Sequence, residues 1–257
     1  MNVKAILQSV AFTALVAGTF ATGIDGVEEA MPVTTVKAAE TVAAAALSDL
    51  TTSTTIETAA AAGPEWDLPN LDHSRVDYWV ERFTTDKRHD FAAFLERKDK
   101  FAPMILTKLN ERGMPADLLY LAMIESGFNP NALSPANAVG LWQFIEPTAE
   151  RYGLTVTRKV DERKDPEKAT EAALSYLSDL HARFGSWYLA AAAYNTGENR
   201  VGRIMRQVTG SERGSEDDYY AIADLLPRET ADYVPLMIAA ARISKEPQKY
   251  GFGGDQS

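Results

Sequence analysis

One carboxylate, Glu125, stands at the end of an otherwise apolar run in the stretch LAMIESGFNP. The residues between Asp117 and Glu125 are apolar or aromatic on every face of a helix, and such a helix is buried on all sides. Partial burial and the negative end of the helix dipole both disfavour the ionised carboxyl, so both raise its pKa. A carboxyl that stays protonated near neutral pH is suited to general acid catalysis. The alternative is a glutamate that points outward or pairs with a cation such as Arg200.

A polar loop follows this helix directly, with the sequence SGFNPNALSPANAVGLWQF. Its Gly, Asn, Ser and Pro residues favour turns, and the loop is long for a plain connection between two helices. It could fold over the end of the Glu125 helix and line a groove with short hydrogen-bonding side chains. A surface loop without function is the alternative, and composition alone favours neither.

A second apolar helix also ends in polar residues. Four alanines lead into Tyr194, Asn195 and Thr196 before Gly197 in the stretch GSWYLAAAAYNTG. Small residues let a helix pack closely against a neighbour, and a buried tyrosine hydroxyl needs a hydrogen-bond partner. The carboxyl of Glu125 is one candidate for that partner, and a backbone carbonyl is the other.

Further carboxylates matter because glycosidases that use water commonly need two, on either side of the scissile bond. Glu146 and Glu150 share one face of a predicted helix, which is read more simply as a solvated surface. Other candidates for a second carboxylate are Asp161, Glu162, Asp165 and Glu167.

The composition excludes several classes of site. With 36 acidic and 26 basic residues the net charge is −10, which disfavours nucleic acid as a partner. The absence of cysteine excludes disulfides, thiolate metal ligands and cysteine nucleophiles. The three histidines, His73, His89 and His181, lie far apart and form no i, i+4 metal pair. We therefore expect neither a metal nor a cofactor.

The elements that position these residues are predicted to be helices. From residue 66 to residue 250 the apolar spacing is helical, without the alternation typical of strands, so we expect an all-α fold. Asp165, just before Pro166, is a candidate N-cap. Glycine and proline signals bound the predicted helices, which cover residues 74–83, 86–97, 98–112, 116–126, 139–152, 166–184, 187–195, 199–207, 217–223 and 228–244.

The first 65 residues have a different character. A short basic start followed by an apolar stretch predicts a secretory signal over residues 1–23, and a retained membrane anchor is the alternative. Residues 24–65 are rich in Ala and Thr and almost free of aromatics, which predicts a linker with too little apolar surface for a core. Residues 66–250 then form one domain, and residues 251–257 form a tail.

Four short motifs together resemble a known family. They are ES at 125–126, ALSPANAVGLWQF at 132–144, AAYNTG at 192–197 and YV at 233–234. In order and spacing they are similar to the motifs of lytic transglycosylases, most of all the membrane-bound murein transglycosylase D type. The resemblance covers roughly residues 66–243 and implies a lysozyme-like helical domain of the goose-type lysozyme and lytic transglycosylase kind.

The resemblance also implies catalytic and binding roles. Glu125 occupies the position of the family's acid and base, and Tyr194 that of the tyrosine which hydrogen-bonds or positions the glutamate. The expected substrate-binding residues are Ser126, Ser134, Gln143, Ile145, Asn195 and Tyr233.

Within that set the implied roles differ. Ser134 and Gln143 fall where the family contacts the saccharide near the acid. Asn195 supports that region, and Tyr233 is closer to packing and cleft lining. Where relatives often carry methionine, this chain has Ile145, and its apolar contact is expected to persist.

The implied reaction is cleavage of the β-1,4 bond between N-acetylmuramic acid and N-acetylglucosamine in peptidoglycan, with formation of a 1,6-anhydro end. Since the chain is acidic, binding should rest on hydrogen bonds and on stacking against Phe128, Tyr194 or Trp142, although Trp142 is equally suited to a core. We expect a monomer that acts on glycan strands in the periplasm of a Gram-negative bacterium, with a membrane tether if the leader is retained. The alternatives are a lysozyme-like hydrolase that uses water and a non-catalytic wall-binding domain.

Overall fold

Helices follow one another along residues 64–253, the part of the chain that the computed structural model describes. Within this part there is no β-sheet, and strand-type pairing is limited to isolated bridges in loops. The predicted all-α fold is confirmed. The α-helices are α2 (Ser74–Thr84), α3 (Arg88–Glu111), α4 (Leu119–Ser126), α5 (Glu146–Arg151), α6 (Pro166–Phe184), α7 (Trp187–Thr196), α8 (Glu198–Thr209), α9 (Glu216–Ile222) and α10 (Arg228–Lys245).

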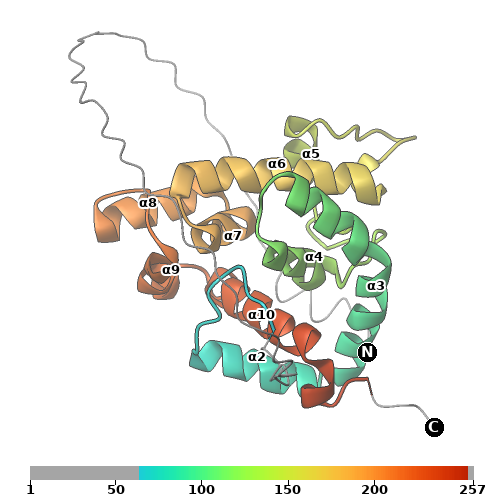
Figure 1. Ribbon diagram of the computed structural model, residues 1–257. Helices are drawn as coiled ribbons and strands as arrows, with labels where there is room; N and C mark the ends of the chain where they lie inside the picture. The colour runs from blue at the N-terminus through green and yellow to red at the C-terminus, as the bar shows by residue number, and fades with distance from the viewer. Residues whose placement is uncertain (1–63, 254–257) are drawn as a thin grey trace, which may run out of the picture. The chain divides into compact units, whose positions relative to one another are not determined.

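Helix α10 lies at the centre of the packing. It contacts α2, α4 and α7, and Figure 1 shows it between α2 on one side and α4 and α7 on the other. Residues 233–241 of α10 are all buried, and α4 is buried along its whole length. Because these two helices are buried on every face and touch each other, any polar side chain at their contact must find its partner inside the protein.

Helix α4 ends just after Glu125 because Gly127 adopts a left-handed conformation, with φ 59°. Glycine reaches this conformation without the steric cost that a Cβ imposes. A Cβ at Gly127 would also collide with the ring of Phe94. Arg97 donates from Nε to the carbonyl of Gly127 (2.6 Å) and so fastens the end of α4 to α3. The backbone just after Glu125 is therefore fixed by the left-handed turn at Gly127 and by the hydrogen bond from Arg97 on α3.

The helix predicted over residues 139–152 is wrong in its first half. Residues 139–144 form a tight hairpin, in which the amides of Val139 and Phe144 each donate to the other's carbonyl (3.0 and 3.1 Å). Gly140 and Gln143 have positive φ values of 87° and 49°, which no helix accommodates. Helix α5 begins only at Glu146. The buried apolar residues of the hairpin imitate helical spacing in the sequence, which explains the error.

The two helices predicted over residues 86–97 and 98–112 are one helix, α3. No glycine or proline separates them at the junction, so nothing interrupts the backbone hydrogen bonds there. Pro103 lies inside α3 on its exposed side, where water can satisfy the carbonyl that loses its donor.

Asp165 caps α6 as predicted, since its carboxylate accepts from the amides of Glu167 and Lys168 (3.0 and 3.1 Å). The predicted leader over residues 1–23 and nearly all of the predicted linker lie outside the described residues. Among the helices of residues 64–253, none combines the length and apolar character needed to cross a bilayer.

Candidate active site

A cleft of about 1010 Å³ opens beside the end of α4. One wall is the loop after α4, including the hairpin of residues 139–144, and the other is formed by the end of α7 and the first turns of α8 and α10. Glu125, Gln143, Ile145, Tyr194 and Asn195 all line it. The three separate sequence stretches that carry candidate chemistry therefore meet at one cavity.

Glu125 is the buried acid of this cleft, with 6% of its surface exposed. Burial raises the pKa of its carboxyl to about 7, while a hydrogen bond from Tyr233 acts in the opposite direction. Arg200, the cation considered as an alternative partner, instead donates to Oγ1 of Thr196 (3.2 Å). Near neutral pH the carboxyl is therefore divided between its acid and its carboxylate form, as a group that must both give and take a proton requires.

The tyrosine that contacts the acid is Tyr233 and not Tyr194. The hydroxyl of Tyr233 donates to Oε1 of Glu125 (2.5 Å), whereas Tyr194 donates to the backbone carbonyl of Trp142 (2.7 Å). Of the two candidate partners for the Tyr194 hydroxyl, the structure has the backbone carbonyl. Tyr233 reaches Glu125 because α10, which carries it, packs directly against α4. Tyr194 remains close to the acid, since burial and then the charge of Glu125 raise its pKa well above the usual range.

Asn195 connects the ends of two helices at the cleft. Its Oδ1 accepts from Oγ1 of Thr230 (2.7 Å), and its Nδ2 donates to Oε1 of Glu229 (3.3 Å). Glu229 also lines the cleft, and the sequence analysis did not single it out. The available signal was its position four residues before Tyr233, which places both side chains on one face of α10.

Two serines of the expected binding set have structural roles instead. Ser126 is fully buried, donates to the carbonyl of Leu141 (2.9 Å) and accepts from the amide of Asn129 (3.1 Å). Ser134 accepts from the amide of Ala138 (3.0 Å) and so closes the turn before the hairpin. Both hydroxyls thus bond to the backbone of the loop, and neither serine is among the residues that line the cleft.

Phe128 and Trp142 do not present their rings to the cleft. Both are fully buried, and Nε1 of Trp142 donates to Oγ1 of Thr170 (2.9 Å). The expectation that these rings stack on sugars is wrong, because both fill the core beneath the loop. Tyr194 and Tyr176, with ring centroids 5.2 Å apart, are the tyrosines that line the cavity.

Most other carboxylates near the cleft already have partners. Asp161 is bound by Arg163 (2.8 Å), and Glu198 accepts from Arg151 (3.0 Å) and from the hydroxyl of Tyr176 (3.2 Å). Glu162 pairs with Lys168 and accepts from the amide of Thr155, Asp165 caps α6, and Glu146 is exposed at the rim. Residues 64–253 contain no group of three His, Cys, Asp or Glu side chains arranged to hold a metal ion.

The sequence of the chain is similar to those of known transglycosylases. Residues 103–215 match the transglycosylase SLT domain family. The chain is 36% identical over 190 residues to membrane-bound lytic murein transglycosylase D of Escherichia coli strain K12, a match that covers 74% of this chain and 41% of that protein. It is 35% identical over 145 residues to peptidoglycan transglycosylase gp16 of Escherichia phage T7, covering 55% of this chain and 10% of that protein.

Among solved structures, the lytic transglycosylase Slt of Pseudomonas aeruginosa, determined as an inactive mutant, is 23% identical with a TM-score of 0.45. That match covers 58% of this chain and 24% of the other. The chain thus spans about two fifths of the length of the Escherichia coli relative and a smaller share of the other two proteins.

Proposed function

The chain carries a transglycosylase SLT domain, and from this premise we propose that it cleaves peptidoglycan glycan strands at the β-1,4 bond between N-acetylmuramic acid and N-acetylglucosamine. The observation that carries the proposal is the single buried acid, Glu125, at a cleft large enough for saccharide units. The names of the relatives from Escherichia coli and phage T7 supply the substrate class.

In the proposed reaction Glu125 acts twice. As the neutral acid it donates its proton to the glycosidic oxygen while the bond from that oxygen to C1 of the muramic acid breaks. As the carboxylate it then takes the proton from the 6-hydroxyl of the same sugar, whose oxygen forms the new bond to C1. The product ends in a 1,6-anhydro ring, no water is consumed, and Glu125 is again protonated. A pKa of about 7 supports both steps near neutral pH.

The surroundings of Glu125 favour this route over hydrolysis. A hydrolase would need a second carboxylate, as nucleophile or as base for water. Asp161 and Glu198 are each held by an arginine, and Glu229 accepts from Asn195. Glu146 is the remaining cleft carboxylate considered from the sequence, and it is exposed at the rim, whereas Glu125 is buried.

Mass spectrometry of the fragments released from purified sacculi tests the proposal. Fragments with 1,6-anhydro ends are lighter by one water than hydrolysed ones, and we expect only the lighter kind. Hydrolysed ends would favour the lysozyme-like alternative. If the wild-type protein releases nothing yet binds sacculi, the wall-binding alternative holds. Glu125→Gln should lower the release rate at least about 100-fold while keeping the helical circular dichroism spectrum.

The same proposal places the protein in the periplasm as a monomer that acts on glycan strands without a cofactor. It is supported by the two relatives whose names describe murein or peptidoglycan transglycosylases. A leader that is cleaved releases the enzyme, and a leader that is retained tethers it to the membrane.

A further inference from the structure

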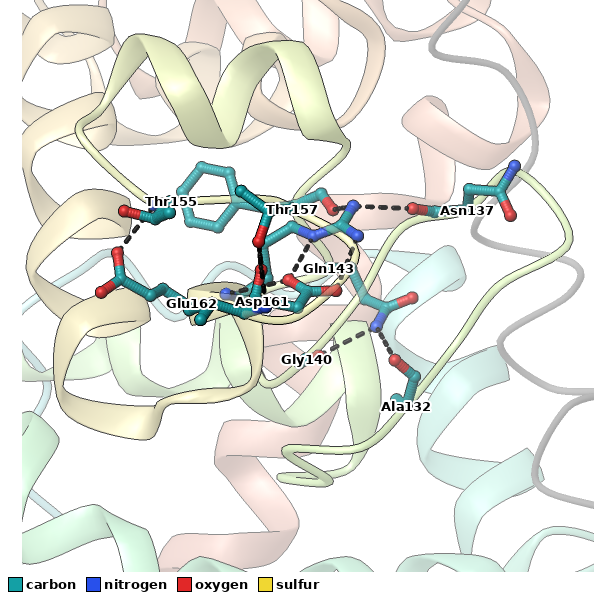
Figure 2. A network of polar contacts seen from close by, with 11 residues as sticks. Ala132, Asn137, Gly140, Gln143, Thr155, Thr157, Asp161 and Glu162 are labelled. Atoms are coloured by element: carbon teal, nitrogen blue, oxygen red, sulfur yellow. Dashed lines mark hydrogen bonds and ion pairs between the residues drawn. The ribbon is translucent and has the colours of Figure 1, made fainter.

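Arg163 is a buried cation in the cleft wall that the proposed chemistry does not use. Only 7% of its surface is exposed, although it lines the cavity. Its Nε and one terminal nitrogen each donate to a carboxylate oxygen of Asp161 (2.8 Å each). The other terminal nitrogen donates to the backbone carbonyls of Asn137 (3.1 Å) and Phe144 (3.2 Å). Figure 2 shows this network beside the contacts of Gln143.

The two carbonyls that Arg163 binds lie at either end of residues 137–144, the segment that contains the hairpin of residues 139–144. Two residues of this segment, Asn137 and Gln143, have left-handed backbone conformations, with φ values of 60° and 49°. Such conformations are costly for residues other than glycine and persist only when the surroundings enforce them. The contact is also close, since a Cβ on Gly140 would collide with the carbonyl oxygen of Arg163. One guanidinium thus holds both ends of a strained segment.

The side chain of Gln143 follows the hairpin backbone. Its Nε2 donates to the carbonyl of Gly140 (2.9 Å) and, more weakly, to that of Ala132 (3.4 Å). With Nε2 turned toward the backbone, Oε1 of the amide remains as an acceptor for a ligand in the cleft. The direction of this amide therefore depends on the hairpin keeping its shape.

We propose that Arg163 is a positioning residue. It holds residues 137–144, and with them the hairpin, so that the amide of Gln143 faces the saccharide bound beside Glu125. The inference rests on the proposed glycan-cleaving function and adds to it the residue that sets the geometry of the binding wall. Because Asp161 neutralises the guanidinium through two parallel bonds, Arg163 acts through the hairpin and does not bind the substrate itself.

Asp161 orients the guanidinium of Arg163. It is held in a short turn of its own, in which residues 156 and 161 form an isolated bridge. The paired carboxylate fixes the plane of the guanidinium and thereby the direction of the remaining donors. A lysine at position 163 would offer one compact ammonium, which cannot match a bidentate carboxylate and two carbonyls at once.

A double-mutant cycle on the full chain tests the inference, with kcat and KM measured for release of soluble fragments from sacculi. Arg163→Lys should raise KM about tenfold with a smaller change in kcat, because a binding contact is misplaced and Glu125 is untouched. Gln143→Ala should have a similar effect. The double variant should be little worse than either single one, because both remove the same contact. The pH at which activity falls to half should not move in any of them.

Lys168→Gln is the matched control, since it breaks the ion pair between the first turn of α6 and Glu162, the neighbour of Arg163, without touching the hairpin. It should leave KM unchanged and combine additively with Gln143→Ala. Fully additive losses in the Arg163→Lys and Gln143→Ala cycle would overturn the inference, and so would an unchanged KM in Arg163→Lys. If Arg163→Lys fails to fold, Asp161→Asn replaces it with the same expectations.

Hydrogen exchange separates this inference from the proposed function, since it needs no turnover. The amides of Val139 and Phe144 should exchange at least about tenfold faster in Arg163→Lys than in Lys168→Gln, while amides of α10 stay alike. Equal exchange at the hairpin in the two variants would overturn the positioning role even if the enzyme is active. Faster exchange in a protein without lytic activity would support the clamp and count against the glycan-cleaving function.

Discussion

The hydroxyl of Tyr233 lies 2.5 Å from Oε1 of Glu125, although 108 positions separate the two residues in the chain. The bond joins α4, which is buried along its whole length, to the buried stretch of α10 over residues 233–241. A donor to a carboxylate stabilises the ionised form, whereas burial stabilises the neutral form. The pKa of Glu125, about 7, reflects these two opposing effects, with burial the larger.

Tyr233→Phe removes the donor and leaves the packing nearly unchanged. The carboxylate loses a stabilising bond, so the pKa of Glu125 should rise further, by about one pH unit. The alkaline limb of the pH profile of glycan cleavage should move upward by the same amount.

Tyr194→Phe is the matched comparison for that shift, because its hydroxyl donates to the carbonyl of Trp142 and not to Glu125. It should leave the midpoint of the alkaline limb in place, whatever it does to the rate. Equal shifts in both variants, or a downward shift in Tyr233→Phe, would contradict the assignment of Tyr233 as the residue that tunes the acid.

Glu125→Gln should change how stability depends on pH. The folded protein binds the proton of Glu125 more tightly than the unfolded chain, whose carboxyl has a pKa near 4.5. The wild-type free energy of unfolding therefore loses a contribution as pH rises from about 4.5 through 7, and the variant does not. At 1.36 kcal/mol per pH unit, the difference between variant and wild type should grow by about 3 kcal/mol in favour of the variant between pH 4 and pH 8.

Urea unfolding of both proteins at several pH values measures this difference. A difference that stays constant across the range would show that Glu125 titrates alike in the folded and unfolded states. Glu146→Gln serves as the control for the loss of a cleft carboxylate, because Glu146 is exposed at the rim.

Glu146→Gln also addresses the route of the reaction. If Glu125 works alone with the sugar's own 6-hydroxyl, removing the charge at the rim should change the cleavage rate by less than about threefold. The products should keep their 1,6-anhydro ends. A loss as large as that of Glu125→Gln would instead identify Glu146 as a second carboxylate and favour hydrolysis.

Asp117→Ala should be among the most destabilising changes outside the cleft. Asp117 is 2% exposed, lies 2.6 Å from Nζ of Lys245, and accepts from the amides of Asp67 and Leu68 (2.9 and 3.0 Å). Its loss leaves two amides without their acceptor and removes the carboxylate partner of the half-buried Lys245 ammonium, which keeps only its bond to the carbonyl of Glu65. The change should cost about 3 kcal/mol in urea unfolding.

The exposed pair of Lys249 and Glu246 (3.0 Å) provides the comparison for Asp117. Lys249→Ala should change the free energy of unfolding far less than Asp117→Ala does, because exposed ion pairs contribute little. Similar effects of Asp117→Ala and Lys249→Ala would mean that the N-terminal segment of the described chain is not fastened through Asp117.

Local signals in the sequence predicted the helical class and the burial of Glu125. An apolar run on all faces, a glycine at position 127 and an N-cap at Asp165 each act within a few residues of one another. The choice of tyrosine was not predictable in this way, because Tyr194 and Tyr233 both end up near Glu125 and only the packing of α10 on α4 decides between them.

The hairpin of residues 139–144 was missed for a related reason. Its buried apolar residues satisfy helical spacing, and the contacts that hold it, above all those from Arg163, come from a separate loop. Ser126 and Ser134, both expected at the substrate, bond to the backbone of the same loop, at the carbonyl of Leu141 and the amide of Ala138.

The most direct test of the central claim is an NMR titration of the Glu125 carboxyl in the folded protein, with ¹³C-labelled glutamate and Glu125→Gln for assignment. One carboxyl resonance, absent from the variant, should titrate with a midpoint near pH 7. A midpoint near 4.5, the value of an ordinary glutamate, would contradict the claim that this acid arrives at the glycan already protonated.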